Sequence, residues 1–215
     1  MNTAVTGAEL LRRVHGLAAG GERVVIGIAG CPGAGKSTLA GWLVDRLTSA
    51  GLPAVWVPMD GFHLADVELE RLGRRGRKGA MDTFDARGYL ALLRRIRAET
   101  ATVVYAPSFD REIEQPIAGA IPVPPATRVV VSEGNYLLAA DEPWPQVHAA
   151  MTEVWYADLD DRVRLDRLIK RHIQFGKTPD QAARWVAEVD EPNAARIRTT
   201  RERADLRVDM DALGI

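Results

Sequence analysis

The stretch from Gly30 to Ser37 reads GCPGAGKS, which has the residue types and spacing of a phosphate-binding loop, G-x-x-x-x-G-K-[ST]. Glycines let such a loop curl tightly, so that successive N–H groups point inward and bind an anion at the N-terminus of the next helix. The Lys36 ammonium would reach the β- and γ-phosphates of a nucleoside triphosphate, and the Ser37 hydroxyl would hold Mg²⁺. An ordinary glycine turn is the alternative.

The sequence on either side of this loop favours the phosphate-binding interpretation. Residues 24–29 form an apolar run that is typical of a buried parallel strand. The residues after the loop show helical spacing, at Leu39, Trp42, Leu43 and Leu47. A strand before the loop and a helix after it are the context that this motif requires.

Two carboxylates lie at or just after the ends of other predicted strands. Residues 54–58 read as a strand that runs into Met59-Asp60-Gly61-Phe62-His63, and residues 128–134 as a buried strand that contains Glu133 near its end. Because the carboxyl ends of parallel strands face the ligand crevice, Asp60 would lie beside the phosphates. Glu133 would hold Mg²⁺ directly or through water, where Asp is more usual, or it would cap the following segment. The metal role is favoured because buried unpaired carboxylates are rare.

Two basic segments each allow two interpretations. The glycine-rich stretch from Arg71 to Gly79 is either a solvated surface loop or a mobile loop that meets an anionic substrate. A charged helix from about 160 to 175 carries Arg164, Arg167 and Arg171 on one face. That face is either solvated or part of a lid that closes over the transferred phosphoryl group.

The remaining elements complete an α/β pattern. We expect a helix N-cap at Asp85, a further strand over 154–158, a capping box at Thr178, a kink or restart near Pro192 and a last strand over 206–209. The proline-rich segment 101–128 predicts an irregular hairpin or flap. The prediction is one domain over 1–215 with a three-layer fold, in which helices flank a parallel sheet, and with a flap at 101–128 and a helical lid at about 160–185.

Composition limits the partners. The 215-residue chain has a formal net charge of −1, so nothing global suggests nucleic acid or a membrane surface. Cys31 is the only cysteine, which excludes an intrachain disulfide and suits a reducing cytoplasm. Residues 1–21 lack the pattern of a signal peptide, and no apolar run reaches membrane-spanning length. We therefore expect a cytoplasmic protein without a nucleic-acid or membrane partner, with a homodimer left open.

At this point the chain resembles the P-loop kinase group that contains uridine kinase, bacterial pantothenate kinase and phosphoribulokinase. It looks most similar to small bacterial nucleoside/nucleotide kinase-like or fructose-transport-associated kinases. The motifs that carry the resemblance are Gly30 to Ser37, Met59 to His63, Asp82 to Asp85, Ser132 to Tyr136 and Thr199 to Asp205. The resemblance implies a P-loop fold and an ATP- and Mg²⁺-dependent transfer of the γ-phosphoryl group to a hydroxyl of a small metabolite.

The resemblance also implies roles for individual residues. Asp60 matches the family's catalytic base, Glu133 the acidic residue beside Mg²⁺ and Ser37, and Arg167 and Arg171 the phosphate-binding lid residues. The implied nucleotide-binding residues are Gly30, Cys31, Pro32, Gly33, Ala34, Gly35, Lys36, Ser37, Thr38, Arg201 and Arg203. The implied acceptor-site residues are Asp60, Phe62, His63, Phe84, Asp85, Arg111 and Tyr136.

The acceptor itself stays open at this stage. Uridine kinases carry a histidine shortly after Pro-x-Tyr-Asp in the flap, whereas this chain has Pro107-Ser108-Phe109-Asp110 followed by Arg111 to Glu114. A nucleoside, a sugar and a vitamin-like alcohol all fit. A nucleotide-binding regulator or switch ATPase is the alternative class, although neither Asn-Lys-x-Asp nor Leu-Ser-Gly-Gly occurs.

Overall fold

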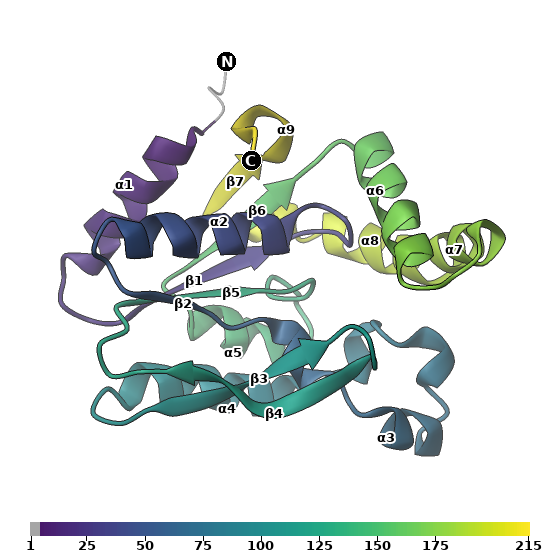
Figure 1. The fold of residues 1–215 in the computed structure, drawn as a ribbon, viewed down its shortest axis with the longest axis horizontal. Helices are drawn as coiled ribbons and strands as arrows, with labels where there is room; N and C mark the ends of the chain where they lie inside the picture. Colours follow the sequence, from purple (N-terminus) through teal and green to yellow (C-terminus); the bar gives the residue numbers. More distant parts are fainter. Residues whose placement is uncertain (1–4) are drawn as a thin grey trace.

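A five-stranded parallel sheet forms the centre of the computed structural model, which describes residues 5–215 (Figure 1). The strand order is β2-β5-β1-β6-β7, and every neighbouring pair is parallel. The bounds are β1 Val24–Ala29, β2 Ala54–Trp56, β5 Val129–Glu133, β6 Glu153–Asp158 and β7 Leu206–Asp209. The predicted α/β fold with a parallel sheet is confirmed. The second strand is shorter than expected, because it ends before Pro58, which has no N–H to donate.

Helices cover both faces of this sheet. Their bounds are α1 Gly7–Ala18, α2 Lys36–Ser49, α3 Asp66–Arg71, α4 Ala86–Ala98, α5 Trp144–Ala149, α6 Asp161–Gln174, α7 Pro179–Trp185, α8 Glu191–Arg198 and α9 Met210–Leu213. Short 3₁₀ turns span Met59–Phe62, Arg75–Arg77, Met81–Thr83 and Arg201–Arg203. No helix among the described residues is both long and apolar enough to cross a membrane.

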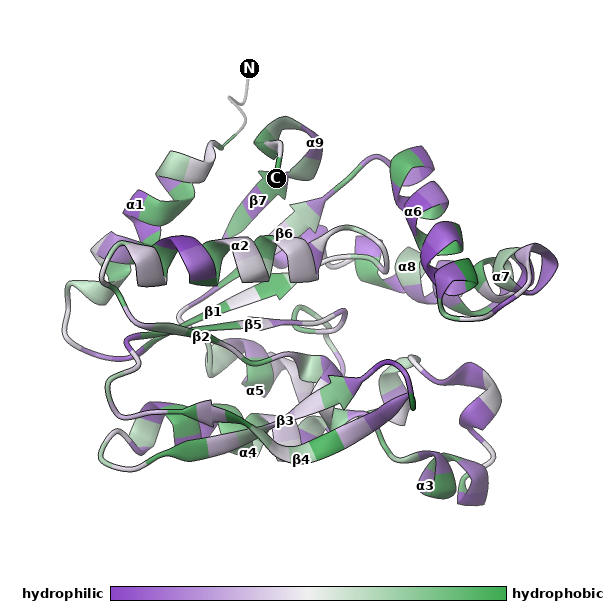
Figure 2. Cartoon of the chain, in the orientation of Figure 1, coloured by the Kyte–Doolittle hydropathy of each residue, from purple (hydrophilic) through white to green (hydrophobic). Residues whose placement is uncertain are grey.

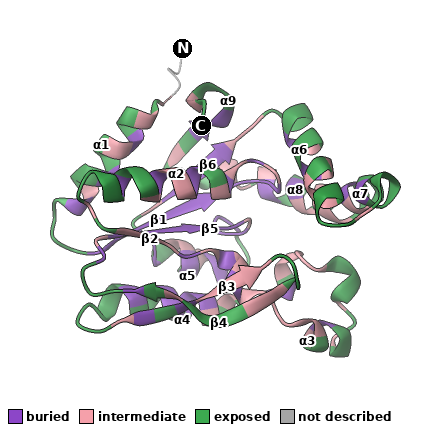
Figure 3. Ribbon diagram, in the orientation of Figure 1, coloured by how far each residue is buried: buried purple, intermediate pink, exposed green. Residues whose placement is uncertain are grey.

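Alternate residues of β1 enter two separate cores. Val24, Ile26 and Ile28 pack with α1 and α2 on one face, whereas Val25 and Ala29 pack with α4 and α5 on the other. Because both faces are covered, the strand reads as a continuous apolar run, and all six of its residues are buried (Figure 3). This burial fixes the register of β1 in the sheet and thereby the position of the phosphate loop that follows it.

A separate antiparallel hairpin lies beside α4 and is drawn in front of it in Figure 1. It consists of β3 Val104–Asp110 and β4 Gln115–Val123. The strands are longer than the irregular flap expected from the prolines, and Pro116 and Pro122 lie within β4. A two-stranded sheet tolerates proline because each strand has an edge that needs no donor. The register shifts between Ala106 and Ser108, around Pro107.

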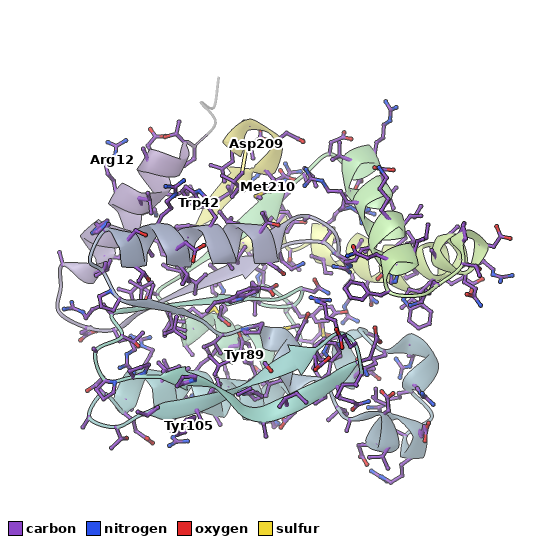
Figure 4. The ribbon with its side chains drawn as sticks, in the orientation of Figure 1. Arg12, Trp42, Tyr89, Tyr105, Asp209 and Met210 are labelled. Carbon is purple, nitrogen blue, oxygen red and sulfur yellow. The ribbon has the colours of Figure 1, made fainter. Side chains whose placement is uncertain are left out.

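The side chain of Tyr89 connects the helix layer below the sheet to the sheet itself (Figure 4). It is fully buried on α4, and its hydroxyl lies 2.6 Å from Ser132 Oγ of β5. The predicted N-cap of this helix is also confirmed, because the Asp85 carboxylate accepts a hydrogen bond from the Gly88 N–H.

Helices α6 and α7 project to one side of the sheet, and hydrophilic residues predominate along them in Figure 2. Asp160 caps α6, and the capping box predicted at Thr178 and Gln181 begins α7. A π-helical turn, Val186–Asp190, follows before α8 restarts at Glu191 with Pro192 in its first turn. The restart near Pro192 was expected, whereas the intervening π-helical turn was not.

Candidate active site

The phosphate loop connects the end of β1 to the start of α2, and its backbone conformation requires glycine. Gly33 and Gly35 have φ angles of 81° and 86°, in the left-handed region that favours glycine. A Cβ at Gly33 would also lie 2.9 Å from the carbonyl oxygen of Arg164 in α6. The loop therefore packs closely against α6, and a side chain at this position would push the two apart.

Lys36 lies within the curve of the loop. Its side-chain Nζ donates to the Cys31 carbonyl oxygen over 3.0 Å, and the residue is buried. Burial lowers the pKa of Lys36, while the nearby carboxylates of Glu133 and Asp60 oppose that shift. The Lys36 side chain thus lies where this motif binds a phosphate.

Glu133 and Ser37 meet where β5 and β1 end. Ser37 Oγ donates to Glu133 Oε1 over 3.2 Å, and Glu133 is buried. Burial, reinforced by Asp60, raises the pKa of Glu133 to about 7, against the opposing effects of Lys36, Ser37 and Arg111. A buried carboxylate that is costly to keep charged favours a cation beside it.

This donor set fits Mg²⁺. A hydroxyl and a carboxylate are hard oxygen ligands, and Mg²⁺ in nucleotide sites takes its other ligands from phosphates and water. Within residues 5–215 no group of three His, Cys, Asp or Glu side chains could hold a metal ion. An ion at Ser37 and Glu133 would therefore depend on a bound nucleotide. The metal-binding role of both residues stays a prediction.

A cavity of about 680 Å³ opens in front of these groups. One end is lined by Lys36, Ser37, Asp60, Glu133 and Arg171. Asp60 lies in the turn after β2, and its Oδ2 is 3.4 Å from Nη2 of Arg111, which lies between β3 and β4. Asp60 and Arg111 are 51 residues apart in sequence, so this contact joins the turn after β2 to the tip of the hairpin.

Aromatic rings form another wall of the cavity. The His63 ring lies 4.0 Å from Phe84 and 4.8 Å from Phe109, between ring centroids. Its Nδ1 is 2.8 Å from the Asp60 carbonyl oxygen, which can only accept. Burial lowers the pKa of His63, so we assign a neutral ring with the proton on Nδ1. This assignment leaves Nε2 as a hydrogen-bond acceptor.

The three arginines of α6 have different surroundings. Arg171 lines the cavity, and burial lowers the pKa of its guanidinium. Arg167 is exposed and reaches alongside the loop at Gly35. Arg164 is only 1% exposed, and it donates to the carbonyl oxygen of Pro32 over 3.1 Å. Its other partners are Asp161 and Glu191. Arg164 thus joins the loop to α6 and fits neither the solvated face nor the phosphate-closing role.

Three residues assigned to the acceptor site, and Arg203 among those assigned to the nucleotide, do not line the cavity of about 680 Å³. Phe62 packs on Tyr89, Asp85 caps α4, and the Tyr136 hydroxyl donates to the Gly79 carbonyl over 2.6 Å. Arg203 donates to the Leu138 carbonyl over 2.8 Å. In contrast, Arg201 lies near the loop, where it pairs with Asp158 and lines a cavity of about 190 Å³ together with Cys31 and Ala34.

Several cavity residues were not singled out from the sequence. They include Asn135, Lys177, Trp185, Asp190 and Asn193. Lys78 and Arg75 come from the basic stretch whose role was left open, and both line the cavity. Lys78 pairs with Asp66 over 2.6 Å and lies 5.5 Å from the Phe109 ring centroid. Arg71 and Arg77 instead form surface ion pairs, as the solvated interpretation expects, whereas contact of Arg75 or Lys78 with an anionic substrate stays a prediction.

Comparisons with known proteins show which family this chain is similar to. A model described as "Phosphoribulokinase / Uridine kinase family" matches residues 25–211. A Schizosaccharomyces pombe protein named "Putative uridine kinase C227.14" is 37% identical over 78% of this chain and 74% of its own length. "Uncharacterized protein YggC" of Escherichia coli is 32% identical over 90% of this chain and 80% of its own length.

A solved structure from Silicibacter sp. TM1040, named "putative fructose transport system kinase", superposes with a TM-score of 0.82. It is 35% identical and covers 93% of this chain and 98% of its own. The similarity therefore extends over nearly the whole of both chains.

Proposed function

Because the chain belongs to the phosphoribulokinase / uridine kinase family, we propose that it transfers the γ-phosphoryl group of ATP to a hydroxyl of a small metabolite. The observation that supports this proposal best is the convergence of Asp60, Lys36, Glu133 and Arg171 on one cavity. Phosphoryl transfer requires positioning and charge stabilisation, and this set offers a base, a metal ligand and two cations.

Each residue has a part in the proposed reaction. The amides of the phosphate loop and Lys36 bind the phosphates, and Ser37 and Glu133 hold Mg²⁺, which when bound neutralises charge on the β- and γ-phosphate oxygens. Asp60 orients the acceptor hydroxyl and takes its proton. Arg171 would place positive charge beside the transferred group from the lid.

The acceptor belongs to a class that a mixed polar and aromatic wall can hold. His63, Phe84 and Phe109 offer flat apolar faces, whereas Lys78 and Asn135 offer hydrogen-bond donors. One relative is named for uridine and another for fructose transport, which makes nucleosides and sugars the first acceptors to test.

The test measures ADP release in the presence of nucleosides, sugars, sugar phosphates, pantothenate and glycerate. We expect release to rise with at least one of these acceptors. Asp60→Asn should keep nucleotide binding and lower the acceptor-dependent turnover about 10²–10⁴-fold, the usual contribution of a positioned base. Asp45→Asn, an exposed carboxylate on α2, is the matched control and should behave as the parent protein does.

One outcome would favour the alternative, a regulatory or switch ATPase. ADP release would then be the same with and without every acceptor, and Asp60→Asn would leave it unchanged.

A further inference from the structure

A cavity of about 800 Å³ lies at the amino ends of β1 and β5, whereas the phosphate loop follows the carboxyl end of β1. It is bordered by the residues before β1, the last turns of α4, the residues before β5 and the end of α5. β1 has six residues, so about 20 Å of strand separates this cavity from Gly30. The cavity is therefore distinct from the proposed kinase site.

Basic side chains dominate the lining. Arg23, Arg94, Arg97 and Arg128 line the cavity, and Glu22 is the one acidic residue among its described lining residues. Arg94 and Arg97 are exposed and lie one turn apart on α4, so their like charges face the same side. The cavity therefore carries an excess of positive charge.

These four guanidiniums have neutral hydrogen-bond partners. Arg94 bonds to Gln146 Oε1 over 3.2 Å, Arg97 to the Ala150 carbonyl over 3.4 Å, and Arg128 to the Ala18 carbonyl over 2.8 Å. Across residues 5–215 none of the four forms an ion pair with a carboxylate. By contrast, Arg95 on the same helix pairs with Glu99 over 3.0 Å.

Arg23 adds a buried charge behind the wall. It is 6% exposed and donates to five backbone carbonyls, those of Ile96, Glu99, Pro124, Pro125 and Thr127. Carbonyl dipoles satisfy its N–H groups but do not cancel its charge, and burial lowers the pKa of this guanidinium. A charge in a low-dielectric wall attracts an anion more strongly than one in water.

We propose that this cavity binds a small metabolite that carries at least two anionic oxygens, as phosphate or carboxylate groups. The planar guanidinium matches either group through paired N–H donors. The cavity volume lies within the range of small-molecule sites. A bound anion would also relieve the repulsion between Arg94 and Arg97. Nothing in the proposed phosphoryl transfer uses these residues.

The experiment separates this cavity from the phosphate loop by working in a Lys36→Ala background. Pyrophosphate and citrate serve as the two probes, titrated by calorimetry at low ionic strength, where screening is weak. We expect at least one probe to bind. Adding Arg94→Gln and Arg97→Gln should weaken that binding at least about tenfold, because two charge-assisted contacts are lost. Adding Arg95→Gln instead should leave it unchanged.

The results also identify the anionic group. Binding of pyrophosphate alone supports a phosphate ligand, and binding of citrate alone supports a carboxylate ligand. The proposal is overturned if neither probe binds at about 10 mM, well above the concentrations of specific ligands. It is equally overturned if the Arg94/Arg97 double substitution binds as tightly as its parent. Both side chains are exposed, and unchanged thermal melting of the variant confirms that it folds.

Discussion

Asp60 and Glu133 bring two carboxylates into one cavity that also contains the buried Lys36. Burial, reinforced by the nearby Asp60 carboxylate, raises the pKa of Glu133 and so adds to the cost of keeping Glu133 ionised. The cations around them, Lys36, Arg111 and Arg171, offset part of that cost. Opposed charges therefore remain near the proposed reaction centre, where a nucleotide with Mg²⁺ would complete the balance.

His63 gives a pH dependence whose direction follows from its burial. The folded protein lowers the pKa of His63, so the unfolded chain binds a proton first as the pH falls. Burial is the largest cause of the lowered pKa of His63, and Lys78 adds to it. Asp60 and Glu114 favour the protonated ring, but their effect is smaller. The contribution of His63 to stability is complete above the unfolded pKa of about 6.5 and declines as the pH falls below it.

We expect His63→Asn to flatten the dependence of unfolding free energy on pH between about pH 7 and pH 5. Urea unfolding at a series of pH values measures this slope. His15→Asn, an exposed histidine on α1, is the control and should keep the parent slope. Parallel curves for the parent and His63→Asn would show that the ring is not protonated preferentially in the unfolded chain.

At the scale of elements, α6 packs directly against the phosphate loop. Gly33 allows the loop to approach the α6 backbone, and Arg164 donates to Pro32 of the same loop. Arg164 also pairs with Glu191 at the start of α8. Helix α6, the phosphate loop and α8 are thus joined through the Arg164 side chain. A substitution of Arg164 therefore affects both the stability of the fold and the geometry of the loop.

Arg164→Met should lower the free energy of unfolding by about 1–3 kcal/mol, because the Pro32 carbonyl and Glu191 lose a charged donor. Arg162→Met changes an exposed residue of the same helix and should have an effect within about 0.5 kcal/mol. Chemical denaturation of both variants provides the comparison. Equal stability of the two would mean that the buried guanidinium is replaceable by an apolar side chain of similar size.

At the scale of the whole molecule, two cavities lie at opposite ends of the central strands. The carboxyl ends of β1, β2 and β5 present the phosphate loop, Asp60 and Glu133, and the arginine-lined cavity lies at the amino ends of β1 and β5. Both faces of the sheet are covered by apolar clusters, so the strand ends cannot move independently. Ligand binding at the loop should therefore stabilise the entire domain.

We expect Mg²⁺ with ADP, at about a hundredfold excess over Kd, to raise the free energy of unfolding by about 2.7 kcal/mol. Lys36→Ala should remove most of this gain, whereas Lys170→Ala, on the exposed side of α6, should retain it. Thermal unfolding with and without the ligands measures the effect. A similar gain in the Lys36 variant would place the nucleotide away from the loop.

The sequence alone determined the features that depend on neighbouring residues. The phosphate loop, the strands before Asp60 and Glu133, the N-cap at Asp85 and the capping box at Thr178 all follow from local spacing and local hydrogen bonds. The parallel sheet followed as well, because helices separate its strands.

Only the tertiary structure decided which side chains meet. Arg164 and Arg171 share a helix face in sequence, yet one is buried against the loop and the other lines the cavity. Similarly, Lys78 enters the cavity while Tyr136 turns toward Gly79. These outcomes depend on how segments distant in sequence pack together, and local periodicity carries no information about that packing.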